Sequence, residues 1–264
     1  MIAAHHLQLS LYMDFFFVNG NIFFHTKSKG VDFLTSQHCT SRSLKTIMTA
    51  LKGIIKKYGC RNFDITDFHG DNEFDKSALK DFLEPALMHV YGREEHVPPI
   101  ERSVQTVKER SRSTCSGLPY RRITILMVRS LIEAITEVLN AFPSKTGISS
   151  TLSPATIVEG KPKPDLSKEM ITFGSYALVY ESTTNTMKPR SVPAIALKRS
   201  NNAGGHYFMS LYSGKRIHGY KWDVLPIDEH IIERVEQLAE DEKQPIMNRG
   251  MPCFEWTPGA QIED

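Results

Sequence analysis

The chain has 264 residues, of which 41% are apolar and 23% are charged, so it can bury a core and is not wholly disordered. Its formal net charge of +2 excludes a polycation as a description of the whole molecule. The most apolar stretch, residues 9–24, contains Asp14 and Asn19-Gly20-Asn21 and is too short to span a membrane, so no membrane partner is expected.

The first half of the chain predicts a mixed α/β sheet covered by helices. Strands are expected at 8–17, 21–26, 31–37, 62–68 and 87–91, with a hairpin turn at Asn19-Gly20. Helices are expected at about 43–58 with Ser43 as N-cap, at 77–83, at 99–115 after Pro98-Pro99, and at about 120–140.

The second half of the chain has shorter strands, expected at 171–181, 194–198, 207–212 and 221–225, and a brief helix near 228–240. Strands this short, separated by Asn and Gly turns, predict a small antiparallel β-barrel. We therefore expect four regions: a core at 8–143, a linker with a short helix at 144–170, the barrel at 171–227, and a short helix with a mostly disordered acidic tail at 228–264.

Charge is concentrated locally. Residues 102–129 contain seven basic side chains and one acid, whereas residues 228–242 contain seven acids and one arginine. A basic segment of this kind can track a phosphate backbone, and it can equally be the solvated face of a helix.

Three carboxylates are candidate site residues. Asp14 lies in a strand between large apolar neighbours, where a charge is costly unless a metal ion, a basic side chain or nearby backbone groups compensate it. Asp71 follows the strand at 62–68, either as a site residue at the sheet edge or as a turn residue, and Asp64, Asp67 and Asp75 are rivals for its role.

The third carboxylate, Glu101, lies in the first turn of the helix at 99–115, where the helix dipole favours an acid in any case. Glu101, Gln105, Lys108 and Arg112 share one stripe of this helix, beside an apolar stripe of Ile100, Val104 and Val107. Gln105, Lys108 and Arg112 of this stripe, and Arg102 at the start of the basic segment, are candidate nucleic-acid contacts. Carboxylates are the ligands that Mg²⁺ prefers, and two such ions can promote in-line displacement at phosphorus.

In their sequence contexts, these acids resemble the D-D-E triad of retroelement integrases, most closely the integrase region of copia-type LTR retrotransposon polyproteins. Asp14 stands in Tyr-Met-Asp-Phe-Phe-Phe-Val-Asn-Gly, Asp71 in Gly-Asp-Asn-Glu-Phe, and Glu101 in Pro-Pro-Ile-Glu-Arg-Ser-Val. The 57 residues from Asp14 to Asp71 are usual for the family, and the 30 from Asp71 to Glu101 are fewer than usual. The similarity covers about residues 10–235 and includes Tyr212-Ser213-Gly214-Lys215-Arg216, which resembles the barrel hairpin of these polyproteins.

The resemblance implies a ribonuclease-H-like core, followed by the small barrel, that carries out DNA integration. The expected reaction is 3′-end processing by water and then strand transfer, with Asp14, Asp71 and Glu101 as catalytic residues. They would also bind the metal, Mg²⁺ or Mn²⁺, with two ions present when DNA is bound. The family's His/Cys zinc module is absent before the core, so we expect a polyprotein fragment or a degenerate element copy.

The expected partners are DNA, both element ends and target, and further copies of the chain. Four cysteines without a C-x-x-C pair, and no secretory signal, favour an intracellular protein, and integration implies the nucleus. Two other functions stay open: a non-catalytic nucleic-acid-binding remnant that uses residues 102–129 and the barrel, and a nuclease on the same fold.

Overall fold

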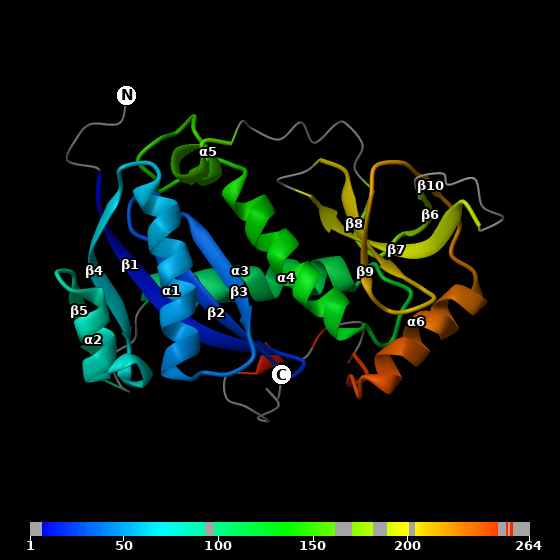
Figure 1. The fold of residues 1–264 in the computed structure, drawn as a ribbon, viewed down its shortest axis with the longest axis horizontal. Coiled ribbons are helices and arrows are strands. Elements are labelled where there is room, and N and C mark those ends of the chain that lie inside the picture. Colours follow the sequence, from blue (N-terminus) through cyan, green and yellow to red (C-terminus); the bar gives the residue numbers. More distant parts are fainter. Residues whose placement is uncertain are drawn as a thin grey trace. The chain divides into compact units, whose positions relative to one another are not determined.

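The computed structural model describes residues 7–92, 98–161, 171–181, 189–200, 204–247, 252 and 254–255. The chain forms two compact units, shown as ribbons in Figure 1. The first unit comprises residues 1–109, 135–164 and 254–260, and the second comprises residues 110–134, 165–253 and 261–264. Within the part of the chain that is described, no helix combines the length and apolarity needed to cross a bilayer.

The first unit is built on a mixed sheet with the strand order β3-β2-β1-β4-β5. β2 is antiparallel to both β1 and β3, whereas β4 is parallel to both β1 and β5. The strands are β1 (Gln8–Val18), β2 (Asn21–Ser28), β3 (Leu34–Cys39), β4 (Asp64–Asp71) and β5 (Leu87–Tyr91). The sheet is the mixed α/β sheet that the sequence predicts.

The turn between β1 and β2 has the predicted geometry. Asn19 and Gly20 both have positive φ angles, 49° and 74°, as a two-residue hairpin turn of the primed type requires. A further strand, β11 (Phe254–Glu255), pairs antiparallel with Phe17 and Val18 of β1. At Phe17 and Val18 one edge of β1 is paired with β2, so β11 lies along the opposite edge. That is the edge to which β4 is bonded earlier in β1.

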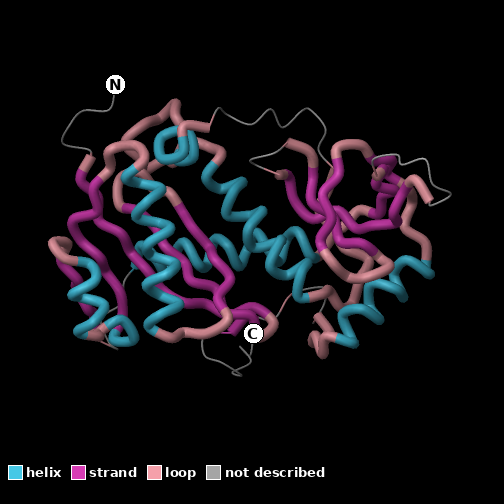
Figure 2. The backbone as a smooth tube through the Cα atoms, viewed as in Figure 1, coloured by secondary structure: helices cyan, strands magenta, loops and turns pink. Residues whose placement is uncertain are grey.

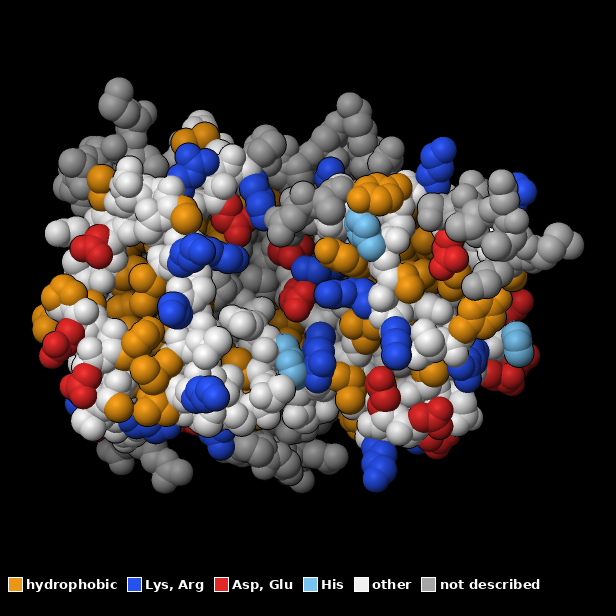
Figure 3. Space-filling model, viewed as in Figure 1, with side chains coloured by type: hydrophobic (Ala, Val, Ile, Leu, Met, Phe, Trp, Pro, Cys, Tyr) orange, Lys and Arg blue, Asp and Glu red, His pale blue; other side chains and the backbone are white. Residues whose placement is uncertain are grey.

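One face of the sheet is covered by α1 (Leu44–Gly59) and α2 (Ser77–Leu83), which share a core with alternate residues of β1 from Leu9 to Phe15. Ser43 caps α1 as predicted, because its side chain accepts a hydrogen bond from the amide of Thr46. A short helix, α5 (Pro154–Glu159), adds Ile157 and Val158 to the same core. In Figure 3 the outer surface of α1 faces the reader, and its exposed basic residues are Lys45, Lys52, Lys56 and Lys57.

The opposite face of the sheet contacts α3 (Pro98–Cys115) and the second half of α4 (Ile125–Asn140). Thr136 of α4 donates to the hydroxyl of Ser36 on β3, 2.8 Å away. Asn140 binds both the amide and the carbonyl of Leu34, so the end of α4 is tied to β3 through two hydrogen bonds. The expected start of α4 near residue 120 is wrong, because Thr124 caps the helix by accepting from the amide of Met127.

The second unit contains a five-stranded antiparallel sheet of order β10-β6-β7-β8-β9. Its strands are β6 (Tyr176–Tyr180), β7 (Ser191–Arg199), β8 (His206–Ser210), β9 (Arg216–Gly219) and β10 (Trp222–Val224). Figure 2 draws these strands in magenta, and α6 (Glu229–Asp241) belongs to the same unit.

This second sheet curls without closing. Trp222 on β10 contacts Phe208 on β8, with 5.5 Å between ring centroids, although two strands separate β10 from β8 in the sheet. The pairing found among the described residues leaves β9 and β10 as the two edges, so the expected closed barrel is corrected to a coiled open sheet. The strand at 216–219 was not predicted.

Candidate active site

Two carboxylates lie at equivalent positions of neighbouring parallel strands. Tyr12 on β1 is in register with His69 on β4, and their rings stack with centroids 4.7 Å apart, so both side chains point to one face of the sheet. Asp14 and Asp71 each follow two residues later along their strands. Because side chains alternate along a strand, the two carboxylates continue on that same face.

Asp14 is the more enclosed of the two. Its Oδ1 accepts a hydrogen bond of 2.7 Å from the amide of Phe15, and its side chain is half-buried. The pKa of Asp14 is raised to about 7, mainly by burial and in addition by the negative charges of Asp71, Glu101 and Glu73, against the opposing effect of the Phe15 amide. Four carboxylates therefore share one local field.

Asp71 is the last residue of β4 and is exposed. Its Oδ1 accepts from the amide of Glu73 at 3.1 Å and so caps the short 3₁₀ helix η2 (Asn72–Phe74). Phe74 is buried and stacks on Phe15, and a Cβ atom at Gly70 would lie 2.6 Å from its ring. Glycine at position 70 therefore lets Phe74 enter the core while Asp71 remains at the surface.

Glu101 reaches the same face because α3 is fastened to the sheet. His25 on β2 is paired with Asp14 in the strand register, and its Nε2 lies 2.8 Å from the hydroxyl of Ser103 on α3. Nδ1 of His25 lies 2.9 Å from the hydroxyl of Ser36, so the fully buried ring links β2, β3 and α3. The expected apolar stripe of Ile100, Val104 and Val107 is buried.

Glu73 was missed by the sequence reasoning. Its carboxylate forms an ion pair with Arg42, with 2.9 Å between Nη1 and Oε1, and Arg42 also lies over the ring of Phe17. Its position two residues after Asp71, in the short helix η2, could have indicated that Glu73 lies near the other carboxylates.

The rival acids have other contacts. Asp67 accepts hydrogen bonds from Thr66 and from Nε2 of His89, and these bonds lower the pKa of its carboxyl. Asp75 pairs with Lys80 at 2.6 Å, and Asp64 is exposed at the start of β4. The negative charge of Asp71 contributes to the raised pKa of Asp14, and Asp67 is not among the causes of that shift. Asp71 is therefore the acid of β4 that interacts with Asp14.

The carboxylate oxygens suit a hard divalent cation by their chemistry. In the described part of the chain, however, no three Asp, Glu, His or Cys side chains lie close enough together to form a ready ligand set. Asp14, Asp71 and Glu73 each have a hydrogen bond or ion pair of their own instead. A cation bound here would offset the repulsion that raises the pKa of Asp14.

The candidate nucleic-acid contacts on α3 are unequally exposed. Arg102 and Gln105 are exposed, whereas Lys108 and Arg112 are half-buried, and Gln105 donates to Glu109 at 3.2 Å. Arg102, Gln105 and Lys108 belong to the first unit and Arg112 to the second.

Two further arginines of the basic segment, Arg121 and Arg122, are paired with the acidic helix α6. Within the second unit Arg122 forms an ion pair of 2.7 Å with Glu240, and the amide and guanidinium of Arg121 both contact Glu236. Glu242 accepts from the amide of Ile125 at 2.6 Å, at the start of α4. The two charged segments thus partly neutralise each other, a pairing that charge counts along the sequence did not reveal.

No protein-family model matches the chain, and no curated protein matches it. Among solved structures, the catalytic core domain of BIV integrase is similar, with 14% sequence identity and a TM-score of 0.42. That match covers 57% of this chain and 93% of the other.

Proposed function

We propose that this protein is a divalent-metal-dependent polynucleotidyl transferase that processes the 3′ ends of DNA and joins them to target DNA. The observation that carries the proposal is the placement of Asp14 and Asp71 on one face of two adjacent parallel strands, where α3 brings Glu101. The sequence resemblance extends the proposal to a copia-type retrotransposon integrase that works as an oligomer in the nucleus.

In this proposal Asp14, Asp71 and Glu101 hold Mg²⁺ or Mn²⁺, two ions once DNA is bound, and the metal supplies activation of the attacking hydroxyl and charge stabilisation at phosphorus. A cation held there would favour the ionised carboxylate of Asp14, whose pKa is raised to about 7 by burial and by the neighbouring carboxylates. His25 and Ser103 hold α3 on the sheet and thereby position Glu101. Arg102, Gln105 and Lys108 contact the phosphate backbone beside the site.

Three single substitutions test the proposal: Asp14→Asn, Asp71→Asn and Glu101→Gln. A labelled duplex with a free 3′ end is incubated with plasmid DNA and Mg²⁺ or Mn²⁺, and joined product is measured. Each variant should lose joining by about 100-fold or more, since a metal ligand contributes several kcal/mol to the transition state, while binding of the duplex is kept. Asp64→Asn, at an exposed acid of the same strand, is the matched control and should join like the parent.

The same assay separates the alternatives. A parent protein that binds DNA and never joins or cleaves it is the non-catalytic remnant, and one that cleaves without joining is a nuclease. A variant that retains the parent rate removes that residue from the site.

A further inference from the structure

Beside the carboxylates, three rings form a continuous row across the sheet. Tyr12 on β1, His69 on β4 and His89 on β5 are neighbours in the strand register. The centroids of the two imidazoles are 4.8 Å apart at an interplanar angle of 13°, and Tyr12 stacks on the other side of His69.

Hydrogen bonds fix the orientation of both imidazoles. Nδ1 of His69 lies 2.9 Å from the hydroxyl of Tyr91, and Nε2 of His89 lies 3.0 Å from Oδ1 of Asp67. Asp67 is held in turn by Thr66 at 2.7 Å. The row is therefore a rigid surface whose orientation does not depend on a ligand.

The outer end of the row is accessible. β5 is the last strand of the sheet on this side, and the side chain of His89 retains 43% of its exposure. The ring of His69 lies directly behind that of His89 in the stack, so the row ends in an exposed aromatic ring supported by a second one. An exposed planar end to a stack of rings is a surface on which a further aromatic ring can stack.

The row is also continuous with the proposed active site. Tyr12 precedes Asp14 by two residues, and His69 precedes Asp71 by two residues, which is about 7 Å along each strand. That spacing is comparable with the distance between consecutive phosphates of an extended nucleic-acid strand. A base held at the row would thus leave a neighbouring phosphodiester at the carboxylates.

We propose that the Tyr12–His69–His89 row binds an unpaired nucleobase of a DNA strand end by stacking on His89. This inference rests on the proposed function for its ligand, and it adds a subsite that no part of the triad assignment requires. It predicts a preference for frayed or single-stranded ends over fully paired ones, because pairing and stacking hold a base within the duplex, whereas an unpaired terminal base is free to leave it and stack on His89.

The test measures binding without reaction. An oligonucleotide with 2-aminopurine as its unpaired 3′-terminal base is titrated with protein in EDTA, and base fluorescence and fluorescence anisotropy are recorded. His89→Leu, which removes the planar ring, should weaken binding by about 5- to 50-fold and abolish quenching of 2-aminopurine. His89→Phe keeps a planar ring and should bind within about threefold of the parent. Leu87→Ala, at an exposed residue on the same strand, should change neither signal.

Parent-like binding and quenching by His89→Leu would overturn the proposal, as would equal weakening for a fully paired blunt duplex. A folding defect is recognised by circular dichroism, and His69→Phe, which keeps the stack, then serves as the second variant and should preserve quenching. Because the assay contains no metal and no reaction, its failure leaves the joining experiment unaffected. Conversely, a protein that quenches through His89 but never joins DNA would retain this subsite and lose the proposed reaction.

Discussion

Asp14 combines an acidic side chain with a site that favours its neutral form. Its carboxyl titrates near pH 7 in the folded chain, against an ordinary value of 3.8, because burial and three neighbouring carboxylates oppose ionisation. Between these two pH values the folded chain binds more protons than the unfolded chain. The free energy of unfolding contributed by Asp14 therefore falls as pH rises from about 4 to about 7.

We predict that Asp14→Asn removes this fall. In EDTA the variant should be more stable than the parent by about 1–3 kcal/mol at pH 8 and nearly equal to it at pH 4, as measured by urea unfolding. Mg²⁺ at pH 8 should stabilise the parent and have little effect on the variant, because the cation binds the ionised carboxylate. Equal pH profiles for the two proteins would contradict this account of Asp14.

His25 is a buried residue whose pKa is shifted downwards, whereas that of Asp14 is shifted upwards. Burial lowers its pKa to about 3, so the ring stays neutral between the hydroxyls of Ser36 and Ser103. The unfolded chain takes up a proton near pH 6.5 and the folded chain does not, so the contribution of His25 to stability is lost as pH falls from 6.5 towards 3.

His25→Ala should lower the free energy of unfolding at pH 7 by about 2–4 kcal/mol, since it leaves a cavity and removes the partner of two buried hydroxyls. Urea unfolding measures the loss, and Thr49→Ala on the exposed side of α1 is the control. A loss no larger than that of the control would show that α3 is held on the sheet by other contacts.

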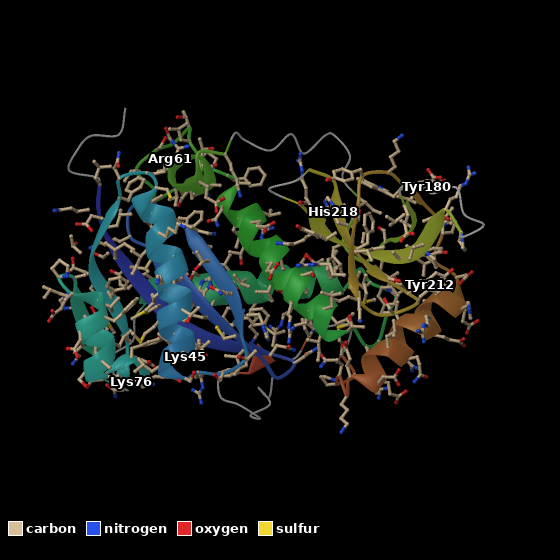
Figure 4. The ribbon with its side chains drawn as sticks, in the orientation of Figure 1. Lys45, Arg61, Lys76, Tyr180, Tyr212 and His218 are labelled. Carbon is tan, nitrogen blue, oxygen red and sulfur yellow. The ribbon has the colours of Figure 1, made fainter. Side chains whose placement is uncertain are left out.

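At the scale of elements, the acidic helix α6 neutralises part of the basic segment that the sequence shows at residues 102–129. The arginines at 121 and 122 are paired with α6, whereas exposed Arg102 and half-buried Lys108 lie on α3, the helix that carries Glu101. The lysines of α1 lie on the other face of the sheet, and Figure 4 marks Lys45 there.

We predict that Arg102→Ala and Lys108→Ala each weaken duplex binding and reduce the slope of log affinity against log salt by about 0.9, the contribution of one phosphate contact. Lys45→Ala removes the same charge from α1 and should leave the slope unchanged. Anisotropy titrations from low to moderate salt measure all three. Equal slopes for the α3 and α1 variants would assign the phosphate contacts to charge in general and not to α3.

The elements that could be predicted are those with a local cause. The helix at Leu44–Gly59 has both a cap and an apolar stripe, and the β1–β2 turn is specified by Asn19-Gly20. By contrast, β9 consists of Arg-Ile-His-Gly, and β11 is a two-residue strand that exists through pairing with β1, more than 230 residues earlier. Such strands depend on distant partners and carry no periodic signal of their own.

The candidate acids could be named from the sequence, and their role as a site stays a prediction. Asp14 stood out because a carboxylate among apolar neighbours needs compensation, whereas Asp71 and Glu101 were singled out by their places after a strand and in the first turn of a helix. Glu73 and the imidazole row did not stand out, since their roles depend on strand register and on the turn that Phe74 anchors. Register between parallel strands is set by packing along their whole length, and the chain between them does not encode it locally.

At the scale of the whole molecule, the two units are interleaved along the sequence. Two of the unit boundaries fall inside helices, between Glu109 and Arg110 of α3 and between Ala134 and Ile135 of α4. Anyone wishing to produce one unit alone therefore cannot do so with a single stop codon or protease site, since either cut would sever a helix in mid-course. To express the first unit alone, residues 110–134 would have to be replaced by a designed loop that joins residue 109 to residue 135. The two helix ends that the loop joins would then need new capping residues.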